Sequence, residues 1–68
     1  MPHYNLTIIT SKNANSTLIH ALEERYNILL VDKKRDYRNT IRTENGYRVI
    51  LHKKKKNIEI STDLLINL

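Results

Sequence analysis

The spacing of apolar residues changes along the first part of the chain, from alternate positions to helical spacing. Residues 4–10, "YNLTIIT", place Tyr, Leu and Ile at alternate positions and are rich in β-branched types, so they predict a strand. Residues 17–26, "TLIHALEERY", repeat apolar side chains at helical spacing. They follow a polar cluster in which Asn13, Asn15 or Ser16 can cap a helix. The pattern therefore predicts a strand followed by a helix.

The next apolar run is short, and its period alone does not settle its structure. Residues 27–32, "NILLVD", fit either a strand or a continuation of the helix. The β-branched side chains of Ile28 and Val31 favour the strand, and residues 33–36, "KKRD", then form a turn. At the other end, residues 61–68 predict either a short helix or an extended tail that packs through its leucines.

The second half of the chain predicts a three-stranded antiparallel meander, and its first hairpin offers two registers. A two-residue loop at Asn45-Gly46 mixes arginines with aliphatic side chains on both faces of the sheet. A three-residue loop that begins at Glu44 pairs Ile41 with Val49 and separates the two kinds of side chain, so it is preferred. Gly46 would then be the left-handed residue of a G1 bulge. The strands of this meander are expected near 37–43, 47–52 and 57–61.

The preferred register gives the meander one apolar and one basic face. A four-residue loop at Lys53–Lys56 places Leu51 opposite Ile58 and Val49 opposite Ile60, which extends the apolar face. The apolar face holds Tyr37, Ile41, Tyr47, Val49 and Leu51, and the basic face holds Arg38, Arg42, Arg48 and His52. We therefore expect a single domain, residues 1–68, with an α+β fold in the order β-α-β-β-β. Its small sheet is expected to be mostly antiparallel, with the helix packed on the apolar face.

Charge adds a partner class to this picture. The chain of 68 residues has a formal net charge of +5, distributed unevenly. Residues 33–56 carry ten lysines and arginines against Asp36 and Glu44, a balance of +8, whereas both flanking segments are slightly acidic. Such asymmetry indicates a polyanionic partner, of which nucleic acid, DNA or RNA, is the commonest.

The candidate nucleic-acid-binding residues are the cations of the basic face and of its two flanking loops. Arginine offers paired hydrogen bonds to a phosphate, and lysine offers a mobile point charge. These candidates are Arg38, Arg42, Arg48, His52, Lys53, Lys54, Lys55, Lys56, Lys33, Lys34 and Arg35. Two alternatives use the same charges: a solvated face that serves solubility, and a small inhibitor or adaptor that docks on an acidic surface of a larger protein.

Catalysis, metal binding and cofactor binding are not predicted. The chain has no cysteine, which excludes disulfides and thiolate zinc sites, and its three histidines are scattered. Ribonuclease chemistry could use His52 with Arg42 and Arg48, but general acid–base catalysis normally needs two positioned groups, and only one histidine lies near the basic patch.

Chain length and composition also bear on the oligomeric state, the location and the source of the protein. A chain of 68 residues buries too little surface to be more than marginally stable, so a homodimer is one way to complete its core. No apolar run reaches the ~20 residues of a membrane span, and the start of the chain lacks a signal-peptide pattern, so a cytoplasmic location is expected. Abundant Asn, Ile and Lys favour an AT-rich genome, as in many viruses and mobile elements.

Overall fold

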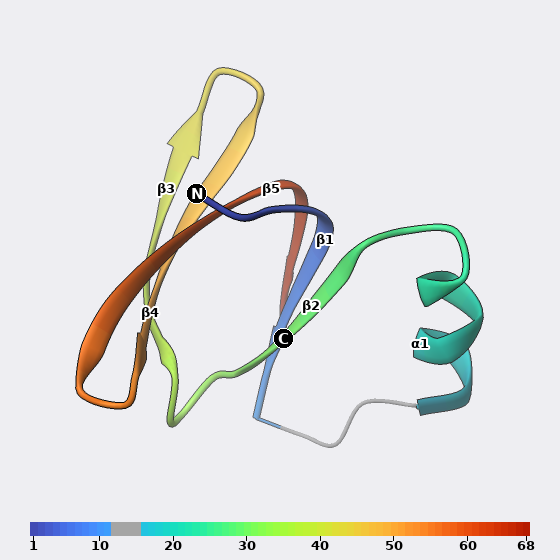
Figure 1. Ribbon diagram of the computed structural model, residues 1–68, viewed down its shortest axis with the longest axis horizontal. Coiled ribbons are helices and arrows are strands. Elements are labelled where there is room, and N and C mark those ends of the chain that lie inside the picture. The colour runs from blue at the N-terminus through green and yellow to red at the C-terminus, as the bar shows by residue number, and fades with distance from the viewer. Residues whose placement is uncertain (12–15) are drawn as a thin grey trace.

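The computed structural model describes residues 1–11 and 16–68, and it shows a mixed sheet of five strands with one short helix (Figure 1). The predicted strands near the N-terminus and at 27–32, the helix between them and the turn at 33–36 are confirmed. The observed order is β-α-β-β-β-β, so the predicted order β-α-β-β-β has one strand too few. The capping candidates Asn13 and Asn15 lie outside the described residues. The elements are β1 His3–Thr10, α1 Ser16–Glu23, β2 Ile28–Asp32, β3 Tyr37–Thr43, β4 Gly46–Lys53 and β5 Lys56–Asn67.

The strand order is β2-β1-β5-β4-β3, with β1 parallel to both of its neighbours and β4 antiparallel to both of its own. The sheet is therefore mixed, and the expectation of a mostly antiparallel sheet is wrong. The reason is the length of β5, which continues past the meander and pairs with β1 from His3↔Ser61 to Ile9↔Asn67. Residues 61–67 are thus extended, so the alternative of a C-terminal helix is wrong.

Strand β5 bends near its middle, and this bend curls the whole sheet (Figure 1). Ile60 and Thr62 are buried, but the next side chain that packs on the core is Leu65, so the alternation shifts by one residue. At the shift the Thr62 hydroxyl donates a hydrogen bond of 2.9 Å to the carbonyl oxygen of Leu64. The curl brings the outermost strands β2 and β3 close enough for residues 33–36 to join them.

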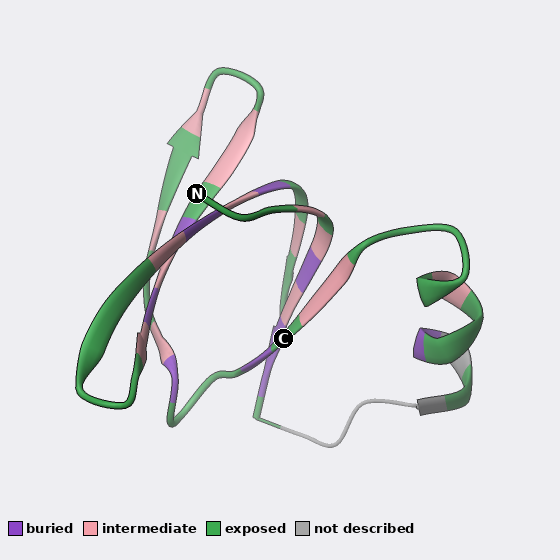
Figure 2. Cartoon of the chain, viewed as in Figure 1, coloured by how far each residue is buried: buried purple, intermediate pink, exposed green. Residues whose placement is uncertain are grey.

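The core lies between the two halves of the curled sheet, where the buried residues of β1, β2, β4 and β5 gather (Figure 2). It consists of Ile9, Val31, Val49, Leu51 and Ile60. In Figure 1 strands β1 and β2 stand between α1 and the β3–β4 hairpin, so the apolar face of the meander packs on β1 and β2. The prediction that the helix covers that face is therefore wrong. Strands β1 and β2 have apolar side chains on both faces, and the helix takes the outer face.

The register of the first hairpin differs from both predicted registers. Thr43 pairs with Gly46 around a two-residue turn, Arg42 pairs with Tyr47, and Ile41 pairs with Arg48. On β3, Arg42 therefore lies on the same face as Tyr47, and Ile41 lies on the same face as Arg48. The predicted separation of an apolar from a basic face is wrong along this strand. The physical reason is the turn, which contains only Glu44 and Asn45 and sets the pairing of β3 as far as Asn39↔Ile50. A bulge between Tyr37 and Asn39 then adds one residue to β3 and places Tyr37 opposite Leu51.

Gly46 begins β4 at a point where the chain has no room for a side chain. Its φ is 155°, and a Cβ there would overlap the carbonyl oxygen of Thr62 on β5. We expect Gly46→Ala to destabilise the fold by more than about 1 kcal/mol, measured as a lower urea midpoint. Glu44→Ala is the control, since Glu44 is exposed in the same hairpin and its loss should change stability by less than about 0.5 kcal/mol. Equal urea midpoints for Gly46→Ala and Glu44→Ala would contradict the close approach of Gly46 to the carbonyl oxygen of Thr62.

Candidate nucleic-acid interface

Two turns meet at one end of the molecule, at the lower left of Figure 1. The backbone N–H of His52 donates a 2.7 Å hydrogen bond to the carbonyl oxygen of Asp36, which ties β4 to the β2–β3 turn. Between the two turns lies a shallow basin of about 420 Å³, lined by Arg35, Asp36, His52, Lys53 and Lys54. We call the cations of these turns the basic end; they are Lys33, Lys34, Arg35, Lys53, Lys54, Lys55 and Lys56.

The basic end accounts for the whole net charge of the protein. Its seven cations stand against Asp32 and Asp36, a balance of +5, and the formal net charge of the chain is also +5. The remaining five cationic and five acidic side chains cancel one another. The molecule therefore carries a strongly polarised charge, which attracts polyanions to one end.

The two acidic residues beside the basic end, Asp32 and Asp36, form their hydrogen bonds and ion pair with residues of the β2–β3 turn. The Asp32 carboxylate accepts hydrogen bonds from the backbone N–H groups of Lys34 and Arg35, each at 3.0 Å. These bonds, that of Arg35 first, lower the pKa of Asp32 below its ordinary value. Asp36 is buried and forms an ion pair with Arg35 at 3.3 Å. The acids thus shape the turn and leave the lysines to face solvent.

The low pKa of Asp32 predicts how its contribution to stability depends on pH. A carboxylate whose pKa is lowered by folding stabilises the fold above its ordinary pKa, and this stabilisation is lost as the pH falls through the lowered value. We expect Asp32→Asn to have a lower urea midpoint than the wild type at pH of about 6, and the difference to vanish at pH of about 2. A difference in urea midpoint that stays constant with pH would show that the charge of Asp32 does not stabilise the fold, contrary to its lowered pKa.

The tip of the β4–β5 hairpin is conformationally unfavourable for its sequence. The predicted pairs Val49↔Ile60 and Leu51↔Ile58 are confirmed, but Lys53 also pairs with Lys56, so only two residues form the turn. These are Lys54 and Lys55, with φ of 50° and 63°. Such a turn favours Asn-Gly, and each left-handed lysine costs about 1–2 kcal/mol. Directly opposed lysines add repulsion.

An unfavourable turn of this kind is a physical reason to look for a function at the tip. Strained backbone gathers at binding and catalytic sites, where the side chain is kept at the expense of stability. All four lysines from Lys53 to Lys56 are exposed, and within the described part of the chain none forms an ion pair. Their charges are therefore available to a partner.

The structure separates the three arginines that were predicted to share a basic face with His52. Arg42 lies beside Tyr47 on the same face as Val49, whereas Arg48 lies on the opposite face. Arg48 forms an ion pair with Glu59 at 3.2 Å, which satisfies its charge within the sheet. The expectation of one shared face is therefore wrong, because it depended on the incorrect register of β3.

Arg38 and His52 have local partners. Arg38 lies in the bulge of β3, where its Nη1 donates to the backbone carbonyl of Tyr37 at 3.4 Å. The His52 Nδ1 lies 2.9 Å from the amide oxygen of Asn57, directly across the hairpin. Because Arg42 lies on the other face, the structure does not assemble His52, Arg42 and Arg48 into one acid–base and phosphate-binding group.

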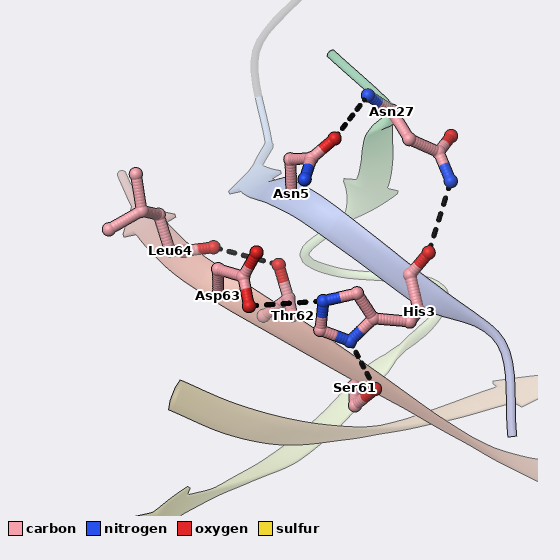
Figure 3. Close-up of polar contacts among 7 residues, drawn as sticks. All are labelled: His3, Asn5, Asn27, Ser61, Thr62, Asp63 and Leu64. Carbon is pink, nitrogen blue, oxygen red and sulfur yellow. Dashed lines mark hydrogen bonds and ion pairs between the residues drawn. The ribbon is translucent and has the colours of Figure 1, made fainter. Parts of the chain in front are cut away.

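A second polar cluster, which sequence reasoning missed, joins β1 to β5 (Figure 3). His3 Nε2 donates to the Asp63 carboxylate at 3.0 Å, and His3 Nδ1 lies 2.7 Å from the Ser61 hydroxyl. Asn27 donates to the side chain of Asn5 and to the carbonyl oxygen of His3, which joins β2 to the same point. Since both side chains of the His3–Asp63 pair are about half exposed, at 52% and 51%, we assign this cluster a structural role at the bend of β5.

No family model, curated protein or solved structure matches this chain, so the proposals below depend on its own geometry. Within residues 1–11 and 16–68, no three His, Asp or Glu side chains lie close enough together to hold a metal ion. Nor is any helix in these residues long and apolar enough to cross a membrane.

Proposed function

We propose that this protein binds nucleic acid, DNA or RNA, through the phosphates, and that the basic end is its contact surface. The observation that supports the proposal best is the concentration of the entire +5 charge on two adjoining turns. Lysine and arginine that neutralise phosphates release counterions, which supplies most of the affinity of non-specific binding. The proposed role is regulatory or architectural, in the cytoplasm of the cell.

The shape of the basic end favours contacts to the backbone over base readout. It presents two short turns rather than a helix that could enter a major groove. Tyr37 is half-buried and its hydroxyl bonds to the Thr40 hydroxyl at 2.7 Å, so its ring is not free to stack on bases. We therefore expect similar affinity for duplexes of different sequence.

Fluorescence anisotropy with two labelled duplex DNAs of unrelated sequence, and with a hairpin RNA of similar length, tests the proposal. At a salt concentration of about 50 mM we expect all three to bind, because phosphate contacts carry no sequence information. The absence of binding to all three would contradict the proposed function.

A second candidate function is docking on an acidic surface of a larger protein, as an inhibitor or adaptor. The same exposed lysines favour it, because a carboxylate-rich surface also complements the basic end. Affinity recovery from cell extract with and without nuclease distinguishes the two. Nucleic-acid binding predicts that nuclease removes the co-purified material, whereas a single protein that persists after nuclease would favour docking.

A further inference from the structure

We infer that a second copy of this chain docks on the C-terminal half of β5, residues 63–67. The pairing of β5 with β4 ends at Tyr47↔Thr62, and from there to Asn67 it pairs with β1 alone. One edge of this segment therefore presents backbone N–H and C=O groups that no neighbouring strand takes up. An open edge of this kind is a template for pairing with another strand.

The same segment also exposes apolar side chains. Leu64 is 64% exposed and Ile66 is 42% exposed. They stand in rows with Leu6 and Ile8 on β1, their direct partners across the sheet, and these rows continue onto β2. Helix α1 covers only part of this face, and the groove of about 310 Å³ between helix and sheet reaches Leu64 without closing over it. The face is thus apolar and open along β5.

The edge of the sheet that β3 forms has features that discourage pairing, and residues 64–67 of β5 lack them. Strand β3 has a bulge at its start and carries Arg38 and Arg42. Bulges, charged side chains and short strands are the usual protections of an edge. The docking segment, residues 63–67, carries one charged residue, Asp63 at its start, which is paired with His3, and residues 64–67 carry none.

The exposed area of the chain matches what a dimer would cover. The accessible surface is 5212 Å². A monomeric protein of 8.1 kDa is expected to expose about 4,500 Å², so this chain exposes about 700 Å² more than a monomer should. A standard interface buries about 800 Å² on each partner. An excess of this size is comparable with the area that one interface would cover on each chain.

A second copy is the occupant that this edge fits best. When two identical strands pair in antiparallel fashion, a two-fold axis relates them, and the contact closes after two chains. Leu64 and Ile66 of each copy would then be covered by the same residues of the other. The dimer would continue the sheet across the axis and would carry one basic end on each copy.

Sedimentation velocity and light scattering at about 100 μM protein, without nucleic acid, test this dimer independently of the proposed function. We expect a mass of twice the 8.1 kDa chain. Leu64→Lys combined with Ile66→Lys should raise the dimer Kd at least about tenfold, since charge on an edge opposes pairing. The matched control is Ile41→Lys with Ile58→Lys, which changes two aliphatic side chains of 36% and 38% exposure and should leave the dimer intact. Ile41 lies on β3, and Ile58 lies in the N-terminal half of β5, outside residues 63–67.

The thermal midpoint of the wild type gives a second readout that does not depend on how the variants fold. A dimer that unfolds to monomers has a midpoint that rises with protein concentration. A wild type of 8.1 kDa with a concentration-independent midpoint would overturn the inference, even if the exposed face then bound a different protein. So would a Leu64→Lys, Ile66→Lys variant that dimerises as tightly as the wild type.

Discussion

Replacing Lys54 and Lys55 with Asn and Gly should make the protein more stable and, at the same time, a weaker binder of nucleic acid. Both lysines have positive φ, at 50° and 63°, and Asn-Gly is the preferred pair for such a turn. We expect a gain of about 1–2 kcal/mol, seen as a rise of several degrees in thermal midpoint. Loss of two of the seven cations should remove about two phosphate contacts with the DNA. The slope of the logarithm of the affinity against the logarithm of the salt concentration should then become less negative by about 2.

The control for this prediction removes the same charges without relieving the turn. Lys54→Gln with Lys55→Gln should weaken binding to the same extent as the Asn-Gly variant, but it should not raise the thermal midpoint. If the Asn-Gly variant is more stable and still binds as the wild type does, the lysines of the turn do not contact the nucleic acid. If neither variant changes stability, the turn carries no strain.

Changing all four lysines from Lys53 to Lys56 to Gln should have the largest effect on binding. The balance of the basic end falls from +5 to +1, and three of its cations remain. With up to seven phosphate contacts, the wild-type affinity should fall about 10³- to 10⁴-fold between about 50 and 200 mM salt. With three contacts, the affinity of the variant should fall only about 40-fold over the same range.

Arg42→Gln with Arg48→Gln is the matched control for charge elsewhere on the sheet. These two residues lie on opposite faces and away from the basic end, and Arg48 is already paired with Glu59. Compared with Lys54→Gln and Lys55→Gln, which also removes two charges, the arginine variant should leave the salt dependence close to that of the wild type. If both variants reduced the salt dependence of binding equally, the contact surface would extend from the basic end over the sheet.

The β4–β5 hairpin could be predicted because both partners have one face that must be buried. Ile58 and Ile60 alternate with polar residues, and only one register places them beside Leu51 and Val49. Strand β3 could not be predicted in the same way. It lies at the edge of the sheet, where Ile41 stays 36% exposed, so burial places little constraint on its register. A bulge there leaves no signal in the alternation of the sequence.

The second half of β5 illustrates a different difficulty. Residues 64–66, "LLI", are consecutive apolar residues, because Leu65 faces the core while its two neighbours face outward. A short apolar run of this kind has no period that separates strand from helix. Its partner β1 is about sixty residues away in sequence, so only the folded sheet shows that the run is extended.

The cations of the candidate site were predictable from the sequence, whereas the second polar cluster was not. Both lysine-rich turns stand out from the charge pattern, and every cation of the basic end was among the predicted binding residues. The two turns adjoin because β3 pairs with β4: Tyr37 lies opposite Leu51, so the residues just before Tyr37 lie beside those just after Leu51. The contact of His3 with Ser61 and Asp63 was missed because it requires the pairing of β1 with β5.

The central proposal is that the basic end binds nucleic-acid phosphates, and the salt dependence of binding measures those contacts directly. The experiment records the Kd of the wild type for a duplex DNA of about 20 base pairs at several salt concentrations between about 50 and 200 mM. With its seven cations engaged, the logarithm of the affinity should fall against the logarithm of the salt concentration with a slope of about −6. A slope shallower than about −2 would show that the basic end does not carry the binding, and would contradict the proposed function.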